Sequence, residues 1–296
     1  MIVNLQGKII TNNLAQNLAR SFRPRTIILS WVVYVCIIQI HLGFDWASVI
    51  LGLILFIALY GIVALQNDLS DIEADKINHR TDIPYASGLL TQNQLIISMA
   101  VLSAIATVVG YILNYHVLLW VSTYILLGYL YSGPLNVKSR GAFAALLLGF
   151  CYGAIPWLIG ASVTNQMDQY NLLFLAFASF IFSSGIIVMK DFRDIKGDRA
   201  TGKNTLLVTK GASYTRYYYL VVTSISYVLL IGYASTLDNN LLLVSSGIVT
   251  GLVNYWLLKS KTIASKGTSR SIRGKWSRMI FFSYAVVLYY MTTGTL

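Results

Sequence analysis

The sequence predicts an all-α integral membrane protein with about nine transmembrane helices, and its composition supports this in two ways. Of 296 residues, 56% are apolar and 11% are charged, whereas soluble domains carry about 25% charged residues. Apolar runs of roughly 20 residues, the length that crosses a bilayer core about 30 Å thick, follow one another along the chain. Because these runs occupy most of the chain, we expect residues 1–296 to form a single membrane domain. The runs begin near Ile27, Trp46, Gln94, His116, Gly141, Asn171, Tyr217, Asn240 and Ser277.

The formal net charge of +11 has a one-sided distribution. With nine spans the loops alternate between the two sides of the membrane, and all 22 Lys and Arg residues fall on the side of the N-terminal arm. The connections on the other side, residues 43–45, 114–116, 162–170 and 236–240, contain none. The positive-inside rule therefore predicts a cytosolic N-terminus and an outside C-terminus. Since topology explains the basic residues, no nucleic-acid partner is expected.

Residues 1–26 are expected to form a cytosolic arm. Leu14, Leu18 and Phe22 recur at helical spacing beside three Arg residues, which is typical of a short helix lying in the membrane interface. The basic segment 259–278, which contains no acid, is expected to lie near anionic lipid head groups.

Small residues in the fifth predicted span indicate how its helix packs. Gly149, Gly153 and Gly160 are expected to permit close approach of a neighbouring helix, and Pro156 is expected to kink this span. Cys36 and Cys151 both fall within predicted spans. We therefore expect buried apolar side chains there, and no disulfide framework.

Two long cytosolic loops, residues 67–93 and 190–216, hold eight of the eleven acidic residues. Each loop contains the pattern Asp-x-x-Asp-x-x-x-Asp, and the second copy follows the first after 123 residues. The repeat indicates an internal duplication of a helical half. Its members are Asp68, Asp71 and Asp75 in the first loop, and Asp191, Asp194 and Asp198 in the second.

The spacing of these carboxylates predicts a metal site. Steps of three and four place each trio on one face of a helix, and we expect each trio near the C-terminal end of a span, where the helix dipole disfavours anions. Two carboxylates 4 Å apart repel by about 4 kcal/mol at an effective dielectric near 20, so facing trios require divalent cations. Ligand sets made only of oxygen select Mg²⁺, with Mn²⁺ possible, and the three scattered His residues offer no zinc site.

Three interpretations of the acidic loops compete. The acids could be solvated loop charges, although that side of the membrane has no other acid. They could relay ions in an ion-coupled transporter, but they lie at helix ends and not within the spans. The third interpretation is an enzyme in which metal ions join two carboxylate clusters to the phosphates of a substrate. It alone accounts for the duplication, the cytosolic face and the interleaved basic residues.

The two motifs resemble those of the UbiA superfamily of intramembrane prenyltransferases, and the resemblance extends over nearly the whole chain. Residues 67–75 read Asn-Asp-x-x-Asp-x-x-x-Asp and match the first aspartate motif of that family. Residues 194–198 read Asp-x-x-x-Asp, are followed by Gly202 and Thr205, and match the second. The Tyr-Ser-Gly-Pro stretch at 131–134 is similar to a segment that follows the fourth span in the family.

Within the superfamily, residues 71–78 together with Pro-Tyr-Ala-Ser-Gly at 84–88 are closest in motif to the homogentisate prenyltransferases. Residues 190–198 resemble both that branch and the geranylgeranylglyceryl-phosphate branch. The likeness to the homogentisate branch implies an aromatic acceptor, of the quinone or tocopherol type such as homogentisate. Asp68 departs from that branch, because homogentisate enzymes commonly have Gln there. The alternatives are geranylgeranylglyceryl-phosphate or chlorophyll-type prenyl transfer, and a UbiA-type terpene cyclase.

The resemblance also implies an architecture and a location. The helices would surround a central cavity that is capped by the two acidic loops and opens laterally to membrane lipid. The site would face the cytosol from a cell (inner) membrane. It would bind an allylic prenyl diphosphate and a lipophilic or aromatic acceptor, with Mg²⁺ as cofactor and no obligate protein partner.

The residues expected to act there fall into three groups. The expected catalytic residues are Asp71, Asp75, Asp194 and Asp198. The metal ligands would be Asn67, Asp68, Asp71, Asp75, Asp191, Asp194 and Asp198. The residues that would bind the substrate, with Lys138 the first choice for the diphosphate, are Lys138, Tyr131, Lys190, Arg193, Asn67 and Lys76.

Overall fold

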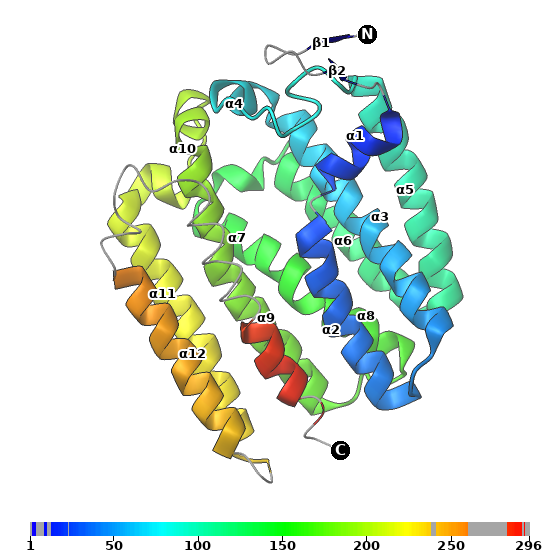
Figure 1. Ribbon diagram of the computed structural model, residues 1–296, viewed down its shortest axis with the longest axis vertical. Helices are drawn as coiled ribbons and strands as arrows, with labels where there is room; N and C mark the ends of the chain where they lie inside the picture. Colours follow the sequence, from blue (N-terminus) through cyan, green and yellow to red (C-terminus); the bar gives the residue numbers. More distant parts are fainter. Residues whose placement is uncertain are drawn as a thin grey trace.

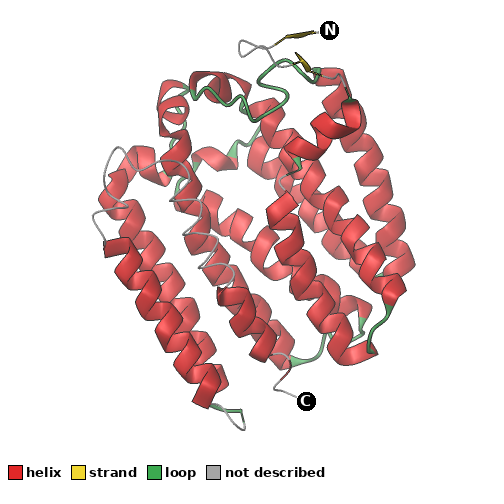
Figure 2. Ribbon diagram, viewed as in Figure 1, coloured by secondary structure: helices red, strands yellow, loops and turns green. Residues whose placement is uncertain are grey.

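The computed structural model describes residues 2–3, 9–10, 13–22, 24–237, 241–259, 283–291 and 293. Most of these residues are helical (Figure 1, Figure 2). Two short strands near the N-terminus, β1 (Ile2–Val3) and β2 (Ile9–Ile10), pair antiparallel. The predicted all-α class is therefore confirmed.

Long helices run side by side to form the body of the molecule (Figure 1). Residues 283–291 are also helical, so each of the nine predicted runs contains helical residues. The helices are α2 (Pro24–Leu42), α3 (Trp46–Ser70), α5 (Gln92–Leu113), α6 (Val117–Ser132), α7 (Ala142–Gly149) with the π-helical turn η2 (Phe150–Ala154) and α8 (Ile155–Val163), α9 (Tyr170–Ile186) with the 3₁₀ turn η3 (Ile187–Lys190) and α10 (Asp191–Ala200), α11 (Leu206–Ala234) and α12 (Leu241–Lys259).

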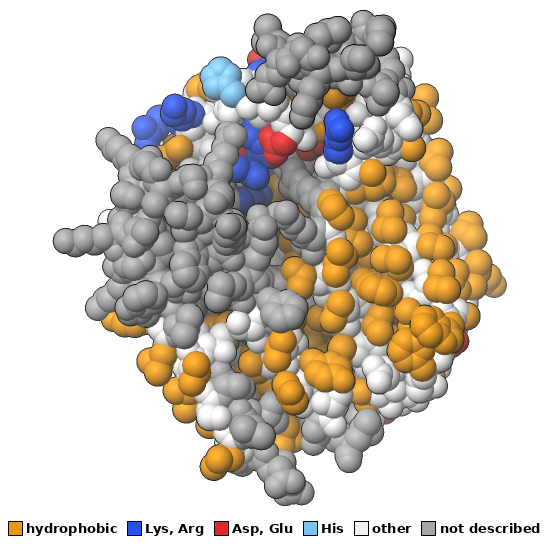
Figure 3. Space-filling model, in the orientation of Figure 1, with side chains coloured by type: hydrophobic (Ala, Val, Ile, Leu, Met, Phe, Trp, Pro, Cys, Tyr) orange, Lys and Arg blue, Asp and Glu red, His pale blue; other side chains and the backbone are white. Residues whose placement is uncertain are grey.

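Five helices in the described part of the chain are long and apolar enough to cross a membrane, and a bent pair near the N-terminus would make a sixth. Figure 3 shows apolar side chains over one flank of the bundle, while most of the visible charged side chains gather towards one end. An outward-facing apolar flank is the surface that a bilayer requires. The protein is thus an integral membrane protein, while the count of nine spans and the sides of the termini stay predictions.

The N-terminal arm contains a short helix, α1 (Leu14–Ser21), at the predicted place. The N-cap residue of this helix is Asn13, whose side chain accepts a hydrogen bond from the Gln16 N–H at 3.4 Å. Leu18 and Phe22 pack against an apolar cluster formed by α3, α5 and the segment between them. The apolar face of α1 therefore lies partly on the protein itself, with Leu14 left exposed.

Close helix packing in the fifth predicted span is confirmed. A Cβ atom added at Gly149 or Gly153 would collide with atoms of α9, and one added at Gly160 would meet Ile37 of α2 at 2.7 Å. The π-helical turn η2 lies directly before Pro156, whose ring cannot fit against an unmodified preceding turn. The wider turn thus takes up the distortion that the proline imposes.

Helix α11 begins at Leu206, well before the apolar run predicted near Tyr217. Gly211 explains the difference, because its φ of 81° and ψ of 175° interrupt the helix. Residues 206–210 therefore form a separate helical turn at the end of the bundle. Much of the expected loop 190–216 is accordingly helical, divided between α10 and the start of α11.

We predict that Gly153→Ala lowers the stability of the protein by about 1–3 kcal/mol, because α9 must move away to admit the methyl group. Thermal unfolding of the purified protein in detergent would show a lower midpoint. Gly232→Ala is the matched control, since an added Cβ on this α11 residue meets no atom within 4 Å. An unchanged midpoint for Gly153→Ala would contradict the packing described above.

Candidate active site

The two acidic segments meet at one end of the bundle, where α4 (Ile72–Ile77) packs against α10 (Figure 1). Between them lies a pocket of about 730 Å³, including its open mouth. Two of the twelve predicted site residues, Asp68 and Lys76, do not line this pocket. Asp68 is buried, and Lys76 is exposed, with its Nζ 3.9 Å from Glu73 Oε1. The other ten predicted residues do line it, namely Asn67, Asp71, Asp75, Tyr131, Lys138, Lys190, Asp191, Arg193, Asp194 and Asp198.

The backbone of the first trio differs from the expected single helix. Helix α3 ends at Ser70, and Asp71, with φ −105° and ψ 7°, separates it from α4. The second trio lies within the one helix α10. Asp75 consequently lies in the first turn of α4, where the dipole stabilises anions by about 0.3–1 kcal/mol. The expectation that each trio lies near the C-terminal end of a span holds for Asp68 and Asp71 at the end of α3 and for the second trio at the end of the helical run Tyr170–Ala200, but not for Asp75.

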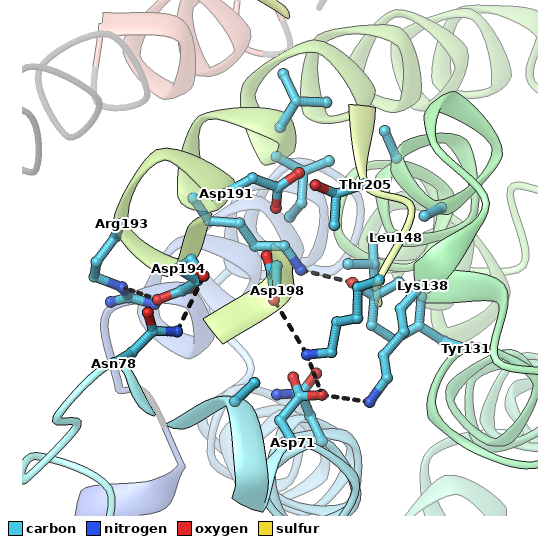
Figure 4. A pocket seen from close by; sticks show the side chains of 18 of the residues that line it. Asp71, Asn78, Tyr131, Lys138, Leu148, Asp191, Arg193, Asp194, Asp198 and Thr205 are labelled. Carbon is cyan, nitrogen blue, oxygen red and sulfur yellow. Dashed lines mark hydrogen bonds and ion pairs between the residues drawn. The ribbon is translucent and has the colours of Figure 1, made fainter. Parts of the chain in front are cut away.

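Two lysines neutralise the central carboxylate, Asp71 (Figure 4). The Nζ atoms of Lys138 and Lys203 lie 2.5 Å and 2.6 Å from the same oxygen, Asp71 Oδ1. Burial disfavours the charged carboxylate, but the two lysines hold the pKa of Asp71 below its usual range. Lys203 also lies 3.2 Å from Asp198 Oδ1, so its amine joins the two aspartate motifs.

A second cationic bridge is made by Arg80, which is 7% exposed. Its Nη1 atom donates to Asp194 Oδ1 at 3.1 Å and lies 3.9 Å from Asp75 Oδ1. Its other donors contact both carboxylate oxygens of Asp82, at 2.8 Å and 2.9 Å. Arg80 therefore ties the loop after α4 to helix α10.

Asn78 fixes the distance between α4 and α10 through backbone atoms. Its Nδ2 donates to the carbonyl of Asp194 at 3.0 Å (Figure 4). Its Oδ1 accepts from the N–H of Gly197 at 2.9 Å. Gly197 allows this approach, because an added Cβ there would collide with the carbonyl of Ala74. We refer to this pair of hydrogen bonds as the Asn78 clasp.

Lys190 and Tyr131 form a third group on the opposite wall of the pocket. Lys190 Nζ donates to the Tyr131 hydroxyl at 2.6 Å. Arg193, the remaining basic residue among the predicted ten, contacts both carboxylate oxygens of Asp194 at 2.9 Å and 3.1 Å. The predicted basic residues thus surround the carboxylates on several sides.

Sequence reasoning missed three residues of this site: Asn78, Arg80 and Lys203. One signal could have found Lys203. A glycine just past the end of a helix adopts a left-handed conformation readily, and Gly202 follows α10 with φ +70°. The next residue is then held beside the last turn, which carries Asp198.

The fit of the pocket to a divalent cation depends on the arrangement of its carboxylates. In the described part of the chain, no three His, Cys, Asp or Glu side chains converge closely enough to hold an ion, because amine groups lie between the carboxylates. Asp75 Oδ2, however, is buried and makes no hydrogen bond to any described residue. Burial, opposed by Arg80 and reinforced by nearby carboxylates, raises the pKa of Asp75 to about 7. The chemistry of the donors, which are carboxylate oxygens with one buried atom lacking a described hydrogen-bond partner, fits Mg²⁺.

Residues 28–284 match the UbiA prenyltransferase family. The chain belongs to this family. Its members are prenyltransferases, and this UbiA-family protein is therefore a membrane prenyltransferase, as the aspartate motifs predicted.

Curated relatives fall into two groups. The digeranylgeranylglyceryl phosphate synthase of Methanothermobacter thermautotrophicus is 24% identical over 92% of this chain and 94% of its own length. The enzyme of that name from Thermococcus sibiricus is 30% identical, but over only 49% of this chain and 50% of its own. The bacteriochlorophyll synthase 33 kDa chain of Cereibacter sphaeroides is 25% identical over 64% of this chain and 63% of its own.

The fold has counterparts among solved structures. A UbiA homolog from Archaeoglobus fulgidus, bound to DMAPP and Mg²⁺, superposes with a TM-score of 0.71 at 14% identity, over 94% of this chain and 99% of that one. A structure of digeranylgeranylglyceryl phosphate synthase superposes with a TM-score of 0.67 at 18% identity, over 95% and 98%. These likenesses confirm the predicted UbiA fold.

We predict that Asn78→Ala lowers both stability and prenyl transfer. The change leaves the Asp194 carbonyl and the Gly197 N–H without the clasp, at a cost of about 1–3 kcal/mol. Asn114→Ala is the control, because Asn114 donates to the Ser162 carbonyl at 2.9 Å, remote from the pocket. Both variants should unfold at lower temperature, but only Asn78→Ala should lose turnover. Full turnover in Asn78→Ala would show that the clasp does not position the site.

Proposed function

We propose that this enzyme transfers a prenyl group from an allylic prenyl diphosphate to an acceptor within the pocket between α4 and α10. The observation that carries the proposal is the amphipathic lining of this pocket. One end has the carboxylates together with Lys138, Lys190, Lys203 and Arg80. The remainder is apolar, formed by Ala144, Ala145, Leu148, Ile187 and Val188. Such a lining matches a substrate with a charged diphosphate head and a hydrocarbon tail.

The carboxylates have the role of metal ligands in this proposal. Asp71 and Asp75 with Asn67, and Asp194 with Asp198 across the pocket, would hold Mg²⁺, with Asp68 and Asp191 as direct ligands or as partners of its water ligands. When bound, Mg²⁺ supplies positive charge that makes the diphosphate a leaving group.

The basic residues bind the diphosphate oxygens. Lys138 and Lys190 are placed for this by their positions in the pocket wall, with the Tyr131 hydroxyl held by Lys190. Arg193 adds charge at the mouth. Lys76 is left out of the proposed site because it is exposed and paired with Glu73.

The chemical step breaks the allylic C–O bond, and the diphosphate departs with the bonding electrons. The apolar wall excludes water from the allylic cation, so that the acceptor attacks in place of hydrolysis. Tyr131 presents an aromatic ring in the same pocket, and a cation–π contact contributes about 2 kcal/mol when desolvated. An aromatic acceptor then restores its ring by losing the proton at the new bond.

Two acceptor classes are candidates. Residues 71–78 and 84–88 favour an aromatic acceptor such as homogentisate, and hence a role in quinone biosynthesis. The names of the relatives, digeranylgeranylglyceryl phosphate synthase and bacteriochlorophyll synthase, favour a glycerol phosphate lipid or a chlorophyll-type acceptor. In either case we propose that the pocket faces the cytosol of the cell membrane, because the basic loops surround it.

We predict that purified protein releases diphosphate from an allylic prenyl diphosphate only when a divalent cation is present. Activity should vanish in EDTA and return with Mg²⁺. Prenyl donors of several lengths, each offered with homogentisate, a glycerol phosphate lipid or a chlorophyllide, would identify the acceptor by mass spectrometry of the product. A cyclic terpene formed without acceptor would identify a cyclase. Solute movement driven by an ion gradient, with no diphosphate released from any donor, would establish a transporter.

We predict that Asp71→Asn and Asp194→Asn each lower turnover at least about 100-fold, because each removes a proposed metal ligand. The double variant should lose much less than the product of the two single losses, since residues that act as one unit are strongly non-additive. Asp168→Asn, on an exposed residue between α8 and α9, should retain full turnover. Multiplicative losses in the double variant would mean that the two motifs act independently.

A further inference from the structure

Lys203 is held beside the second aspartate motif by the end of helix α10. Gly202 donates its N–H to the Arg199 carbonyl at 3.3 Å, and Lys203 donates its N–H to the Asp198 carbonyl at 2.9 Å. Together with the left-handed conformation of Gly202, these two bonds form a Schellman motif. The motif fixes the backbone of Lys203 relative to the helical turn that carries Asp198.

The side chain of Lys203 reaches from this anchor to the first motif. Its Nζ lies 2.6 Å from Asp71 Oδ1 and 3.2 Å from Asp198 Oδ1, and 12% of the side chain is exposed. A cation that joins the two motifs through these two carboxylates would take the same position. An amine of the protein therefore occupies the place of a bridging cation.

Neither neutralisation nor helix packing requires this second amine on Asp71. Lys138 contacts the same carboxylate oxygen at 2.5 Å. Arg80 and the Asn78 clasp already join the loop after α3 to α10. The contact of Lys203 is thus additional to the contacts that hold these segments together.

We propose that Lys203 is an internal counter-ion that competes with the divalent cation for Asp71 and Asp198. In the metal-free protein its amine bridges the two motifs and limits their repulsion. A divalent ion on the same oxygens repels the ammonium, and the flexible four-carbon stem allows the amine to move away. The diphosphate of the bound substrate is then the anion available to it. This inference rests on the proposed function, because it takes Asp71 and Asp198 as metal ligands.

Metal binding to the substrate-free protein gives the first test. The full chain in detergent is stripped with EDTA, the EDTA is removed, and Mn²⁺ is titrated while free Mn²⁺ is followed by electron paramagnetic resonance. Lys203→Met should lower the Mn²⁺ dissociation constant at least fivefold, whereas Lys203→Arg should stay within twofold of the wild type. Lys196→Met, which removes an equal charge from an exposed position on α10, should also stay within twofold. If the Met variant does not fold, Lys203→Gln should show the same decrease in the Mn²⁺ dissociation constant.

Inorganic pyrophosphate gives the second test and should respond in the opposite direction. With Mn²⁺ saturating, Lys203→Met should bind pyrophosphate at least fivefold more weakly than the wild type and Lys196→Met. Equal or weaker Mn²⁺ binding in both uncharged Lys203 variants would overturn the inference and leave the proposed metal site intact. A wild-type protein that binds no Mn²⁺ would overturn the metal site itself and this inference with it.

Discussion

The structure of the site depends on one constraint: carboxylates that lie at the end of an apolar bundle need cations close to them. Removing a charged group from water is costly unless a partner offsets the loss. Asp71 has two lysines on one oxygen, and Asp194 has Arg80 and Arg193. Apart from the Arg193–Asp194 pair within α10, these ion pairs connect segments that are far apart in the sequence. The same contacts therefore join the segments that line the pocket and neutralise its carboxylates.

Uncharged residues make the rigid contacts of the site, and lysine side chains make the adjustable ones. The Asn78 clasp forms hydrogen bonds with backbone atoms of α10, and the close approach of α4 at Gly197 leaves no room for a Cβ atom between the two helices. Their separation is thus set by groups that carry no charge. The lysines, by contrast, hold the carboxylates through long side chains that can change partners. A pocket that must accept ions and release a diphosphate needs both properties, a fixed frame and movable charge.

Local patterns in the sequence predicted the helices and most of the site, because both depend on short spacings. Apolar runs place the helices. The repeated Asp spacing identified five of the pocket residues, and the motif resemblance with its neighbouring basic residues identified five more. The break at Asp71 was not predictable from that spacing, since a helix would also have satisfied it. The contacts by which Asn78, Arg80 and Lys203 join the two motifs span 114 to 132 residues, and contacts over such separations depend on how helices pack. Lys76 shares a motif with Asp75 but projects from the outer face of α4.

The long separation between paired charges has a consequence for biosynthesis. Asp71 and Lys203 are 132 residues apart, and synthesis proceeds at about 5–20 residues per second. Asp71 therefore emerges from the ribosome roughly 7–26 seconds before its partner does. During this interval the first motif has to remain at the hydrated membrane surface while later helices insert. The order of translation thus makes the segment after α10, with Lys203 and Thr205, the last part of the pocket to be synthesised.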